Sequence, residues 1–448
     1  MLHKHRIAVF GAGYIGLVTG ACFAKLGHDV IVRDIQPERI DVLRGGGVPI
    51  HEEGLGELIA QHTDHLTFTL DAEEAVREAT VAYVCVDTPP TQSGDADLSR
   101  IWQVIDTLRD ARHLQAVVVK STVPVGTGAQ VRAVMDQAGL QHVGYASNPE
   151  FTAEGHAVRD FLHPDRVVIG SDDPETAKLV AALHEGVDGP VVEMDVPSAE
   201  MVKLAANALL ATKISFTNEI ATICEATGAD IENVVRAVGL DHRLGPHYMK
   251  AGVGWGGSCF PKDSRALRAM AGNTGYPFQM LSSVIEVNDL QPRRAIQRLK
   301  DELGGRLQGR TIALLGIAFK PGTDDVREAP STILASRLLA EGATVRCWDP
   351  LVRPLDTPPW SSAVRCPSPV DTMSDADAAI IVTDWPELRD VPWDRVASAM
   401  ASPLVLDGRN LLDPQHMASL GFTYMSIGRR TVRASASQPD TTAPSPTF

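Results

Sequence analysis

A glycine-rich turn between two apolar segments near the start of the chain constrains the fold most strongly. Ile7–Phe10 is a short apolar run, Gly11-Ala-Gly-Tyr-Ile-Gly16 follows it directly, and a helical pattern comes next. A second apolar run then ends on Asp34, eighteen residues after Gly16. A strand, a glycine turn, a helix and a second strand that ends in an acid predict a dinucleotide-binding unit.

The glycines and the acid have separate tasks in such a unit. Gly11 permits the tight turn, Gly13 lets a pyrophosphate approach the helix N-terminus, and Gly16 allows close packing of helix on strand. Asp34 would accept hydrogen bonds from the adenosine ribose, which favours NAD over NADP. Arg33 beside it leaves some tolerance for a 2′-phosphate. The alternative is a glycine-rich turn with no ligand.

Length, charge and cysteine usage exclude several classes of protein. A chain of 448 residues is too long for one core and suggests two to four domains. Its formal charge of -15 argues against a nucleic-acid or anionic-membrane partner. We expect no signal peptide and no membrane span. The six cysteines lack C-x-x-C spacing, so we expect no zinc site or other metal, no disulfide framework, and a reducing cytoplasm.

Short apolar runs continue the βα alternation at residues 81–86, 116–120 and 166–170, as in parallel strands covered on both faces. Polar segments follow the first two runs and carry Thr88, Ser121 and Thr122. Ligands of doubly wound sheets bind at the carboxyl ends of strands, so these hydroxyls are placed where cofactor and substrate would meet. Ordinary turn chemistry is an equally weighted alternative.

Helices separate this lobe from a second βα lobe. The region 197–239 is helical, with Ser198 as its expected N-cap and Glu200 in its first turn, and strands are expected at 311–316, 344–348, 378–382 and 404–408. The predicted fold class is α/β, with two Rossmann-like doubly wound parallel-sheet domains joined by a central helical region. We expect domains at residues 1–196, 197–303 and 304–430, and a disordered tail at 431–448.

The stretch Gly252–Asp263 presents a thiol, Cys259, which four glycines precede and which Lys262 and Asp263 follow three and four residues later. Glycines let the backbone pass close to a ligand, and a nearby cation favours the nucleophilic thiolate. Lys203, Lys262 and an oxidised nicotinamide are all candidate cations, which the sequence does not rank. The alternative for Cys259 is a small buried hydrophobic residue.

Two further pairs could serve a thiol site. Lys203 and Asn207 are spaced i, i+4, which places a cation and an amide donor on one helix face; a solvated face is the alternative. Glu150 and Glu154 also lie four residues apart, and either could act as a general base, although surface acids are the default.

Taken together, these motifs resemble the nucleotide-sugar 6-dehydrogenases, the UDP-glucose/GDP-mannose dehydrogenase family. The resemblance covers residues 5–428 and rests on five motifs in the family's order: the turn 11–16, the segment 148–154, Lys203 with Asn207, the segment 256–263, and the segment 319–327. It implies an NAD-dependent, cytoplasmic homodimer whose dimer core is formed by the central helices. The implied reaction oxidises a sugar C6 alcohol to a carboxylate in two hydride transfers.

The resemblance also implies roles for individual residues. Cys259 matches the nucleophile that forms a thiohemiacetal and then a thioester, Lys203 and Asn207 match the groups that stabilise the oxyanion, and Asp263 matches a residue that positions a water and orients the lysine. The cluster around the hydrolytic water is Thr122, Glu150 and Glu154, of which either glutamate could be the base. The implied cofactor contacts are Gly11, Gly13, Tyr14, Ile15, Gly16, Asp34, Arg39, Thr88, Ser121, Thr122, Glu154 and Arg327.

The implied substrate contacts are Glu150, Phe151, Lys203, Asn207, Arg243, Tyr248, Lys250, Gly256, Phe319 and Lys320, with Arg243 reaching the partner's substrate. Phe260 and the run Arg327–Pro330 resemble the UDP-glucose branch, and GDP-mannose or a UDP-N-acetylhexosamine is the alternative substrate. Asp87 and Trp255 depart from the family pattern, which puts cofactor affinity and the fit of the cysteine loop in question. A one-step hydroxy-acid dehydrogenase and a nucleotide-sugar or NAD sensor are the competing functions; neither needs the thiol constellation.

Overall fold

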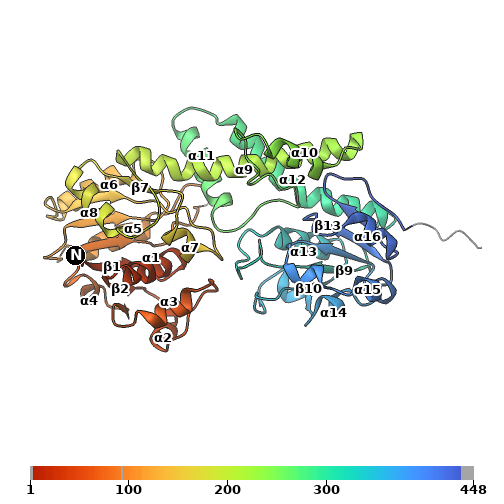
Figure 1. The fold of residues 1–448 in the computed structure, drawn as a ribbon, viewed down its shortest axis with the longest axis horizontal. Coiled ribbons are helices and arrows are strands. Elements are labelled where there is room, and N and C mark those ends of the chain that lie inside the picture. The colour runs from red at the N-terminus through yellow and green to blue at the C-terminus, as the bar shows by residue number, and fades with distance from the viewer. Residues whose placement is uncertain (1–3, 92–93, 110, 435–448) are drawn as a thin grey trace, which may run out of the picture. The chain divides into compact units, whose positions relative to one another are not determined.

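The computed structural model describes residues 4–91, 94–109 and 111–434, and the chain divides into two compact units (Figure 1). Unit 1 takes the chain up to Leu210 together with Ser258–Ser282 and Gly322–Asp324. Unit 2 takes Ala211–Gly257, Ser283–Pro321 and the chain from Asp325 onward. The long helix α9 (Val196–Thr227) and the cysteine loop therefore each contribute residues to both units.

Unit 1 is built on an eight-stranded sheet in the order β3-β2-β1-β4-β5-β6-β7-β8. Neighbouring strands are parallel except β6 and β7, which are antiparallel through the pair Ser147 and Gly170. The order of strands reverses between β1 and β4, where doubly wound sheets bind ligands. The strands are β1 (Arg6–Phe10), β2 (Asp29–Arg33), β3 (Leu66–Thr69), β4 (Val81–Val84), β5 (Ala116–Val119), β6 (Gly144–Ser147), β7 (Val167–Gly170) and β8 (Val191–Met194).

Helices cover both faces of this sheet because successive side chains of a strand point to opposite sides. Ile7 and Val9 of β1 join a core with α1, α3, α7 and α8, whereas Ala8 and Phe10 join one with α4, α5 and α6. The helices of unit 1 are α1 (Tyr14–Lys25), α2 (Pro37–Arg44), α3 (Leu55–Gln61), α4 (Ala72–Val76), α5 (Ser99–Thr107), α6 (Thr127–Gln137), α7 (Ala157–Leu162), α8 (Pro174–Leu183) and α11 (Phe260–Asn273).

Unit 2 contains a six-stranded, wholly parallel sheet in the order β11-β10-β9-β12-β13-β14. Its strands are β9 (Thr311–Leu315), β10 (Thr344–Trp348), β11 (Val364–Arg365), β12 (Ala378–Ile381), β13 (Leu404–Asp407) and β14 (Thr423–Ser426). Its core also includes Ala221 and Cys224 of α9 and Leu299 of α12. The helices are α10 (Ile231–Gly239), α12 (Gln279–Glu302), α13 (Pro330–Ala340), α14 (Pro369–Met373), α15 (Trp393–Ala399) and α16 (Pro414–Ser419), with 3₁₀ turns at Trp360–Ser362 and Pro386–Arg389.

The predicted fold class is confirmed: two parallel-sheet α/β domains with a central helical region. Three strands of unit 1 escaped the sequence analysis, namely β3, β6 and β8. β6 reads Gly-Tyr-Ala-Ser, and β8 is a mostly exposed edge strand, so neither presents the apolar run expected of a buried strand. Of the predicted tail, residues 435–448 lie outside the described residues, whereas Val432 pairs with Tyr424 of β14.

The start of α9 corrects the expected N-cap. Ser198 lies inside the helix, and Asp195 immediately precedes it. The carboxylate of Asp195 accepts the Ser198 N–H at 2.8 Å and the Ser198 hydroxyl at 2.9 Å. Asp195 thus satisfies an N–H group that has no partner within the helix, which is the work of a capping residue.

Close packing at the start of α1 depends on Gly16. A Cβ atom there would lie 1.8 Å from the Gly11 carbonyl oxygen, and Gly11 itself has φ +107°. At Gly13 a Cβ atom would have nothing within 4 Å. The fold therefore requires glycine at position 16, inside α1. It does not require glycine at position 13, directly before α1, where the space next to the backbone is open.

We therefore expect Gly16→Ala to lower the free energy of unfolding by about 1–3 kcal/mol or more, because the helix must shift away from β1. Gly13→Ala, the matched control, should unfold close to the wild-type temperature in the absence of ligand. Thermal unfolding followed by circular dichroism distinguishes them. Equal destabilisation by both substitutions would contradict this assignment.

Candidate active site

The carboxyl edge of the unit 1 sheet gathers the predicted site segments. The glycine turn follows β1, Asp34 follows β2, Thr88 lies four residues after β4, and Ser121 and Thr122 follow β5. The segment from Asn148 to Glu154 follows β6. Because parallel strands all end at one edge, residues far apart in sequence arrive at the crevice of the switch point.

Asp34 is fixed beside the glycine turn. Its carboxylate is buried and accepts the Ala12 N–H at 2.6 Å and the Gln36 N–H at 2.9 Å. Arg39 Nη1 lies 3.6 Å from Asp34 Oδ2. The open space above Gly13 and the acid at the end of β2 together fit the pyrophosphate and ribose of a dinucleotide.

The hydroxyls at this edge hold the strand ends together. Thr88 donates to the Thr122 carbonyl at 2.7 Å, and Ser121 donates to the Val86 carbonyl at 2.7 Å. Tyr14 donates to the His51 carbonyl at 3.0 Å and contacts Asp324 at 3.2 Å. Ile15, in the same first turn of α1, packs against the core. Local turn chemistry thus accounts for part of this polar set.

A buried ion pair forms the centre of the site. Lys203 Nζ of α9 lies 2.7 Å from Glu150 Oε1, and both side chains are about 5% exposed or less. Burial alone would raise the pKa of Glu150, but the Lys203 charge and hydrogen bonds from Lys203 and Thr152 bring that pKa below its ordinary value. Burial would lower the pKa of Lys203, but Glu150, Cys259 and Asp263 raise it. Both groups are therefore held in their charged forms.

One helical turn further along α9, Asn207 donates to Asp263 Oδ2 at 2.7 Å. Lys262 Nζ lies 2.5 Å from the other oxygen, Asp263 Oδ1. Lys203, Asn207 and Asp263 are all buried, so the solvated-face alternative for the α9 pair is wrong. The direct partner of Lys203 is Glu150, and Asp263 acts on the lysine through its charge.

Cys259 lies directly before α11 and keeps part of its surface accessible. The protein packed around it raises the pKa of its thiol to about 11; Lys203 opposes this rise, whereas Glu150 and Asp263 add to it. Lys203 is thus the protein cation that favours the thiolate, while Lys262 is paired with Asp263.

Ser258 bridges the thiol and the second glutamate. Its hydroxyl donates to Glu154 Oε1 at 2.9 Å and lies 3.4 Å from Cys259 Sγ. Phe151 stacks beneath Arg166, whose guanidinium carbon is 3.7 Å from the ring centroid, and Lys203 Nζ lies 5.7 Å from the same ring. Unit 1 therefore brings together Cys259, Lys203, Asn207, Asp263, Glu150, Phe151 and Glu154 in one network.

The remaining predicted substrate residues belong to unit 2. Arg243 follows α10, is exposed and pairs with Asp241 at 2.6 Å. Tyr248 has φ 62°, a strained conformation for a residue that is not glycine. Lys250 Nζ lies 2.6 Å from Asp384 Oδ2, in the segment that follows β12. Of these groups, Lys250 is thereby held at the carboxyl edge of the second sheet.

A second group follows β9 of that sheet. A Cβ atom at Gly256 would lie 2.2 Å from the Glu328 carbonyl oxygen, so the cysteine loop passes directly against this segment. Lys320 Nζ lies 5.6 Å from the Phe319 ring centroid, and Arg327 makes paired hydrogen bonds to Asp325 at 2.7–3.0 Å. The edge thus carries basic side chains, of which Arg327 is paired with Asp325.

Both departures from the family pattern have local partners. Asp87 pairs with Arg100 at 2.8 Å, so a neighbouring cation compensates its charge. Trp255 donates its indole N–H to the Ser215 hydroxyl at 3.0 Å, and its backbone N–H to Asn288 Oδ1 at 2.7 Å. The larger side chain is therefore accommodated within unit 2.

The sequence analysis did not predict the contacts that two buried glutamates near the site, Glu200 and Glu52, make with backbone N–H groups. Glu200 accepts the Gly126 and Gly128 N–H groups, and Glu52 accepts the Gly155 and Ala157 N–H groups, all at 2.7 Å. The available signal was the spacing of Glu200, three residues before Lys203 on α9. Glu52 has no comparable signal, because its partners lie about a hundred residues away.

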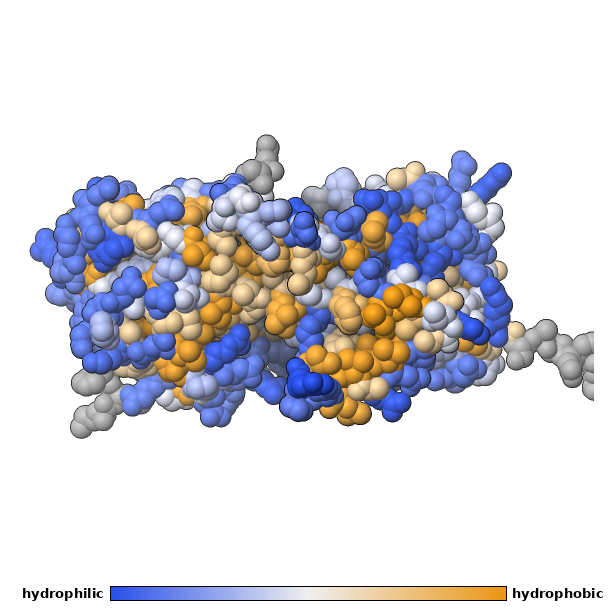
Figure 2. Space-filling view, turned by 90° about the horizontal axis from the view of Figure 1, so that it is seen from above, coloured by the Kyte–Doolittle hydropathy of each residue, from blue (hydrophilic) through white to orange (hydrophobic). Residues whose placement is uncertain are grey.

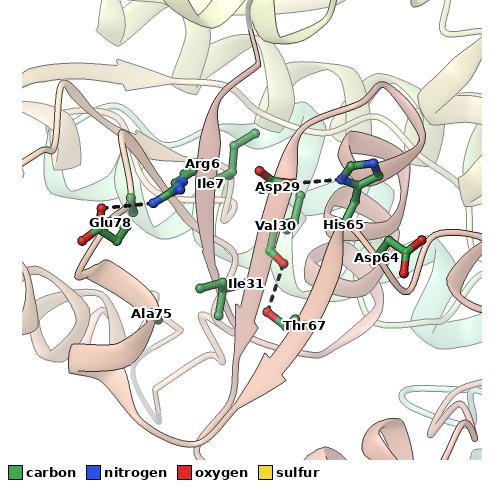
Figure 3. Close-up of a pocket in the computed structure, with 11 residues that line it drawn as sticks. Arg6, Ile7, Asp29, Val30, Ile31, Asp64, His65, Thr67, Ala75 and Glu78 are labelled. Carbon is green, nitrogen blue, oxygen red and sulfur yellow. Dashed lines mark hydrogen bonds and ion pairs between the residues drawn. The ribbon is translucent and has the colours of Figure 1, made fainter.

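A separate cavity of about 300 Å³ lies beside the beginnings of β1, β2 and β3 (Figure 3). Its charged side chains pair with one another, Asp29 with His65 at 2.8 Å and Arg6 with Glu78 at 3.0 Å. None of the predicted site residues lines it. Among the described residues, no cluster of His, Cys, Asp or Glu could hold a metal ion, and every helix is too short or too polar to cross a bilayer.

Three family models match the chain in succession. Residues 5–188 match the NAD binding domain of the UDP-glucose/GDP-mannose dehydrogenase family, residues 197–290 its central domain, and residues 313–414 its UDP binding domain.

Individual relatives agree with this. A UDP-glucose 6-dehydrogenase of Pseudomonas aeruginosa is 44% identical over 442 residues, covering 95% of this chain and 97% of the relative. The UDP-glucose 6-dehydrogenase TuaD of Bacillus subtilis is 42% identical, covering 96% and 94%. The structure of a UDP-glucose dehydrogenase from Pyrobaculum islandicum superimposes with a TM-score of 0.86 at 38% identity, covering 92% and 95%. The chain therefore belongs to the UDP-glucose/GDP-mannose dehydrogenase family and is an NAD-dependent nucleotide-sugar dehydrogenase.

Proposed function

We propose that the protein oxidises UDP-glucose to UDP-glucuronate. The observation that carries this is the buried Lys203–Glu150 pair beside the Cys259 thiol, because a one-step dehydrogenase or a sensor needs no such constellation. The relatives named as UDP-glucose 6-dehydrogenases and the match of residues 313–414 to a UDP binding domain support the choice of nucleotide sugar. GDP-mannose and UDP-N-acetylhexosamines are the alternative substrates.

Bound NAD supplies the hydride acceptor for each of the two oxidations. In the first, the C6 alcohol loses a hydride and a proton and becomes an aldehyde. Cys259 sulfur then adds to the aldehyde carbon while the thiol proton passes to the carbonyl oxygen, and the resulting thiohemiacetal loses a hydride from carbon and the hydroxyl proton to become a thioester. Water cleaves the carbon–sulfur bond, which releases the carboxylate and returns the proton to the thiol.

Three residues have roles set by their charges and hydrogen bonds. The Lys203 ammonium and the Asn207 amide are donors that would stabilise negative charge on the C6 oxygen. Glu150 is kept ionised by Lys203 and is therefore available as the base that activates water. Thr122 and Glu154 remain proposed members of the hydrolytic cluster, with Asp263 holding Asn207 in place.

We also propose that the protein is a homodimer through α9. Leu209, Phe216 and Ile223 are 63%, 57% and 55% exposed and recur every seven residues, so they line one face of the helix. Figure 2 views the molecule from above and shows apolar surface along the face on which α9 runs in Figure 1. An exposed apolar stripe of this kind is typical of a protein interface, and a second copy would bury it.

The reducing cytoplasm is the proposed compartment. All six cysteines lie in the described part of the chain and are free thiols. Cys259 must stay reduced to act as a nucleophile, which suits a reducing compartment.

Stoichiometry tests the two-step reaction. Two NADH should form for each UDP-glucose consumed, measured by absorbance at limiting sugar against a panel of nucleotide sugars. Cys259→Ala should abolish acid formation. One NADH per sugar with release of aldehyde, or wild-type activity in Cys259→Ala, would exclude the covalent route. Faster turnover of another nucleotide sugar would reassign the substrate.

The pH dependence of thiol alkylation tests the electrostatics. In the free enzyme, iodoacetamide should alkylate Cys259 with a midpoint near pH 11, because burial favours the protonated thiol. Glu150→Gln should lower that midpoint, since the Glu150 charge raises the thiol pKa. Glu175→Gln, an exposed carboxylate on α8, is the matched control and should leave it unchanged. An unaltered midpoint in Glu150→Gln would refute the coupling.

Sedimentation tests the dimer. The wild-type protein should sediment as a dimer, and Phe216→Glu should produce monomers because it places a charge in the apolar stripe. Val364→Glu changes an exposed apolar residue of β11 and serves as the control. A dimer that persists in Phe216→Glu would place the interface elsewhere.

A further inference from the structure

One face of α9 is tied to three separate segments of unit 1, one for each turn. Glu200, Lys203 and Asn207 follow one another at intervals of three and four residues and so lie on the same face. Glu200 binds the start of α6, Lys203 binds Glu150 after β6, and Asn207 binds Asp263 in the first turn of α11. The last two ties belong to the proposed reaction centre, and the first does not.

The Glu200 tie is a buried, two-pronged contact. Oε2 accepts the Gly126 N–H and Oε1 accepts the Gly128 N–H, each at 2.7 Å, and Glu200 as a residue is 2% exposed. Burial raises the pKa of Glu200, and the two N–H donors oppose that rise. Gly126 directly precedes α6 and Gly128 lies in its first turn, where N–H groups lack partners within the helix.

The space around this contact is filled. A Cβ atom at Gly128 would lie 2.4 Å from Val196 Cγ1 of α9 and 2.8 Å from the Tyr145 ring of β6. The first turn of α6 therefore packs directly on α9. The two hydrogen bonds of the Glu200 carboxylate then oppose movement of α6 along α9. A carboxamide in place of Glu200 offers only one acceptor oxygen to the two N–H groups.

The same contact bears on the loop that carries Thr122. That loop runs from the end of β5 to Gly126, and it is held at its start by the Thr88 hydroxyl on the Thr122 carbonyl. Thr127 donates to the Pro124 carbonyl at 2.6 Å and stiffens the middle. Glu200 closes the other end, so the position of Thr122 is set relative to the helix that carries Lys203.

We propose that Glu200 is a positioning residue for the hydrolysis of the thioester, since it holds the Thr122 loop in register with the Lys203 face of α9. The inference rests on the proposed covalent function. Hydrolysis needs a water, a base and an oxyanion site aligned at once, so a small displacement between the loop and α9 affects this step most. The hydride transfers use the cofactor, the Cys259 loop and the Lys203 and Asn207 donors, which α9 carries itself and which are held by Glu150 and Asp263.

Rapid-quench mass spectrometry with NAD and UDP-glucose separates the steps. In Glu200→Gln, the two pulses of NADH should form at rates within about twofold of wild type, while the covalent adduct on Cys259 decays about tenfold more slowly. Glu200→Asp should show a smaller defect, because it keeps two acceptor oxygens on a shorter arm. Asp173→Asn is the matched control: it removes a carboxylate that caps α8 in the same unit and should leave adduct decay unchanged.

The outcomes are distinguishable from failure of the function itself. A wild-type enzyme that yields one NADH per sugar overturns the covalent reaction, whatever Glu200 does. A wild-type enzyme that yields two, with adduct decay in Glu200→Gln unchanged or every step slowed equally, overturns the positioning role. If Glu200→Gln does not fold, the rates of NADH formation and of adduct decay are measured in Glu200→Asp instead. Equal slowing of all these steps in Glu200→Asp would contradict the proposal.

Discussion

The buried ion pair between Lys203 and Glu150 is the interaction on which the rest of the site depends. Two charges withdrawn from water are costly unless each meets a partner with good geometry, and removing one partner leaves the other charge uncompensated. Here the pair joins the helix α9 to the segment after β6 at 2.7 Å. It therefore fixes the distance between the proposed oxyanion donor and the proposed base, and it contributes to the field in which the Cys259 thiol ionises.

The charge arrangement explains why the free enzyme keeps its nucleophile protonated. Lys203 is the cation that most favours the thiolate, but its charge is already matched by Glu150, and Asp263 adds further negative potential. A thiol with a pKa near 11 is poorly reactive toward adventitious electrophiles. Reactivity thus has to arise when positive charge enters the site, which links nucleophile activation to ligand binding.

Much of the fold was predictable, because the βαβ unit and the parallel strands leave strong local signals. The turn Gly11–Gly16 and Asp34 form a known motif, and β4, β5, β9 and β12 are short apolar runs typical of buried parallel strands. The misses have separate physical causes. β8 is exposed at a sheet edge, and α9 is capped by Asp195 outside the predicted boundary. The ties of Glu200 and Glu52 run to backbone N–H groups, which every residue but proline carries, so no side-chain pattern marks them.

The glycines before Cys259 show how one sequence feature can serve a second purpose. The sequence suggested that they bring the backbone close to a ligand. In unit 2 a Cβ atom at Gly252, Gly256 or Gly257 would collide with protein: at 2.9 Å with Gly408, at 2.2 Å with Glu328, and at 2.7 Å with the Phe319 ring. Packing within unit 2 is thus sufficient to require these glycines. The thiol that follows belongs to unit 1, so the glycine run fixes where the chain leaves unit 2, and the Lys203 network determines what Cys259 does once it arrives.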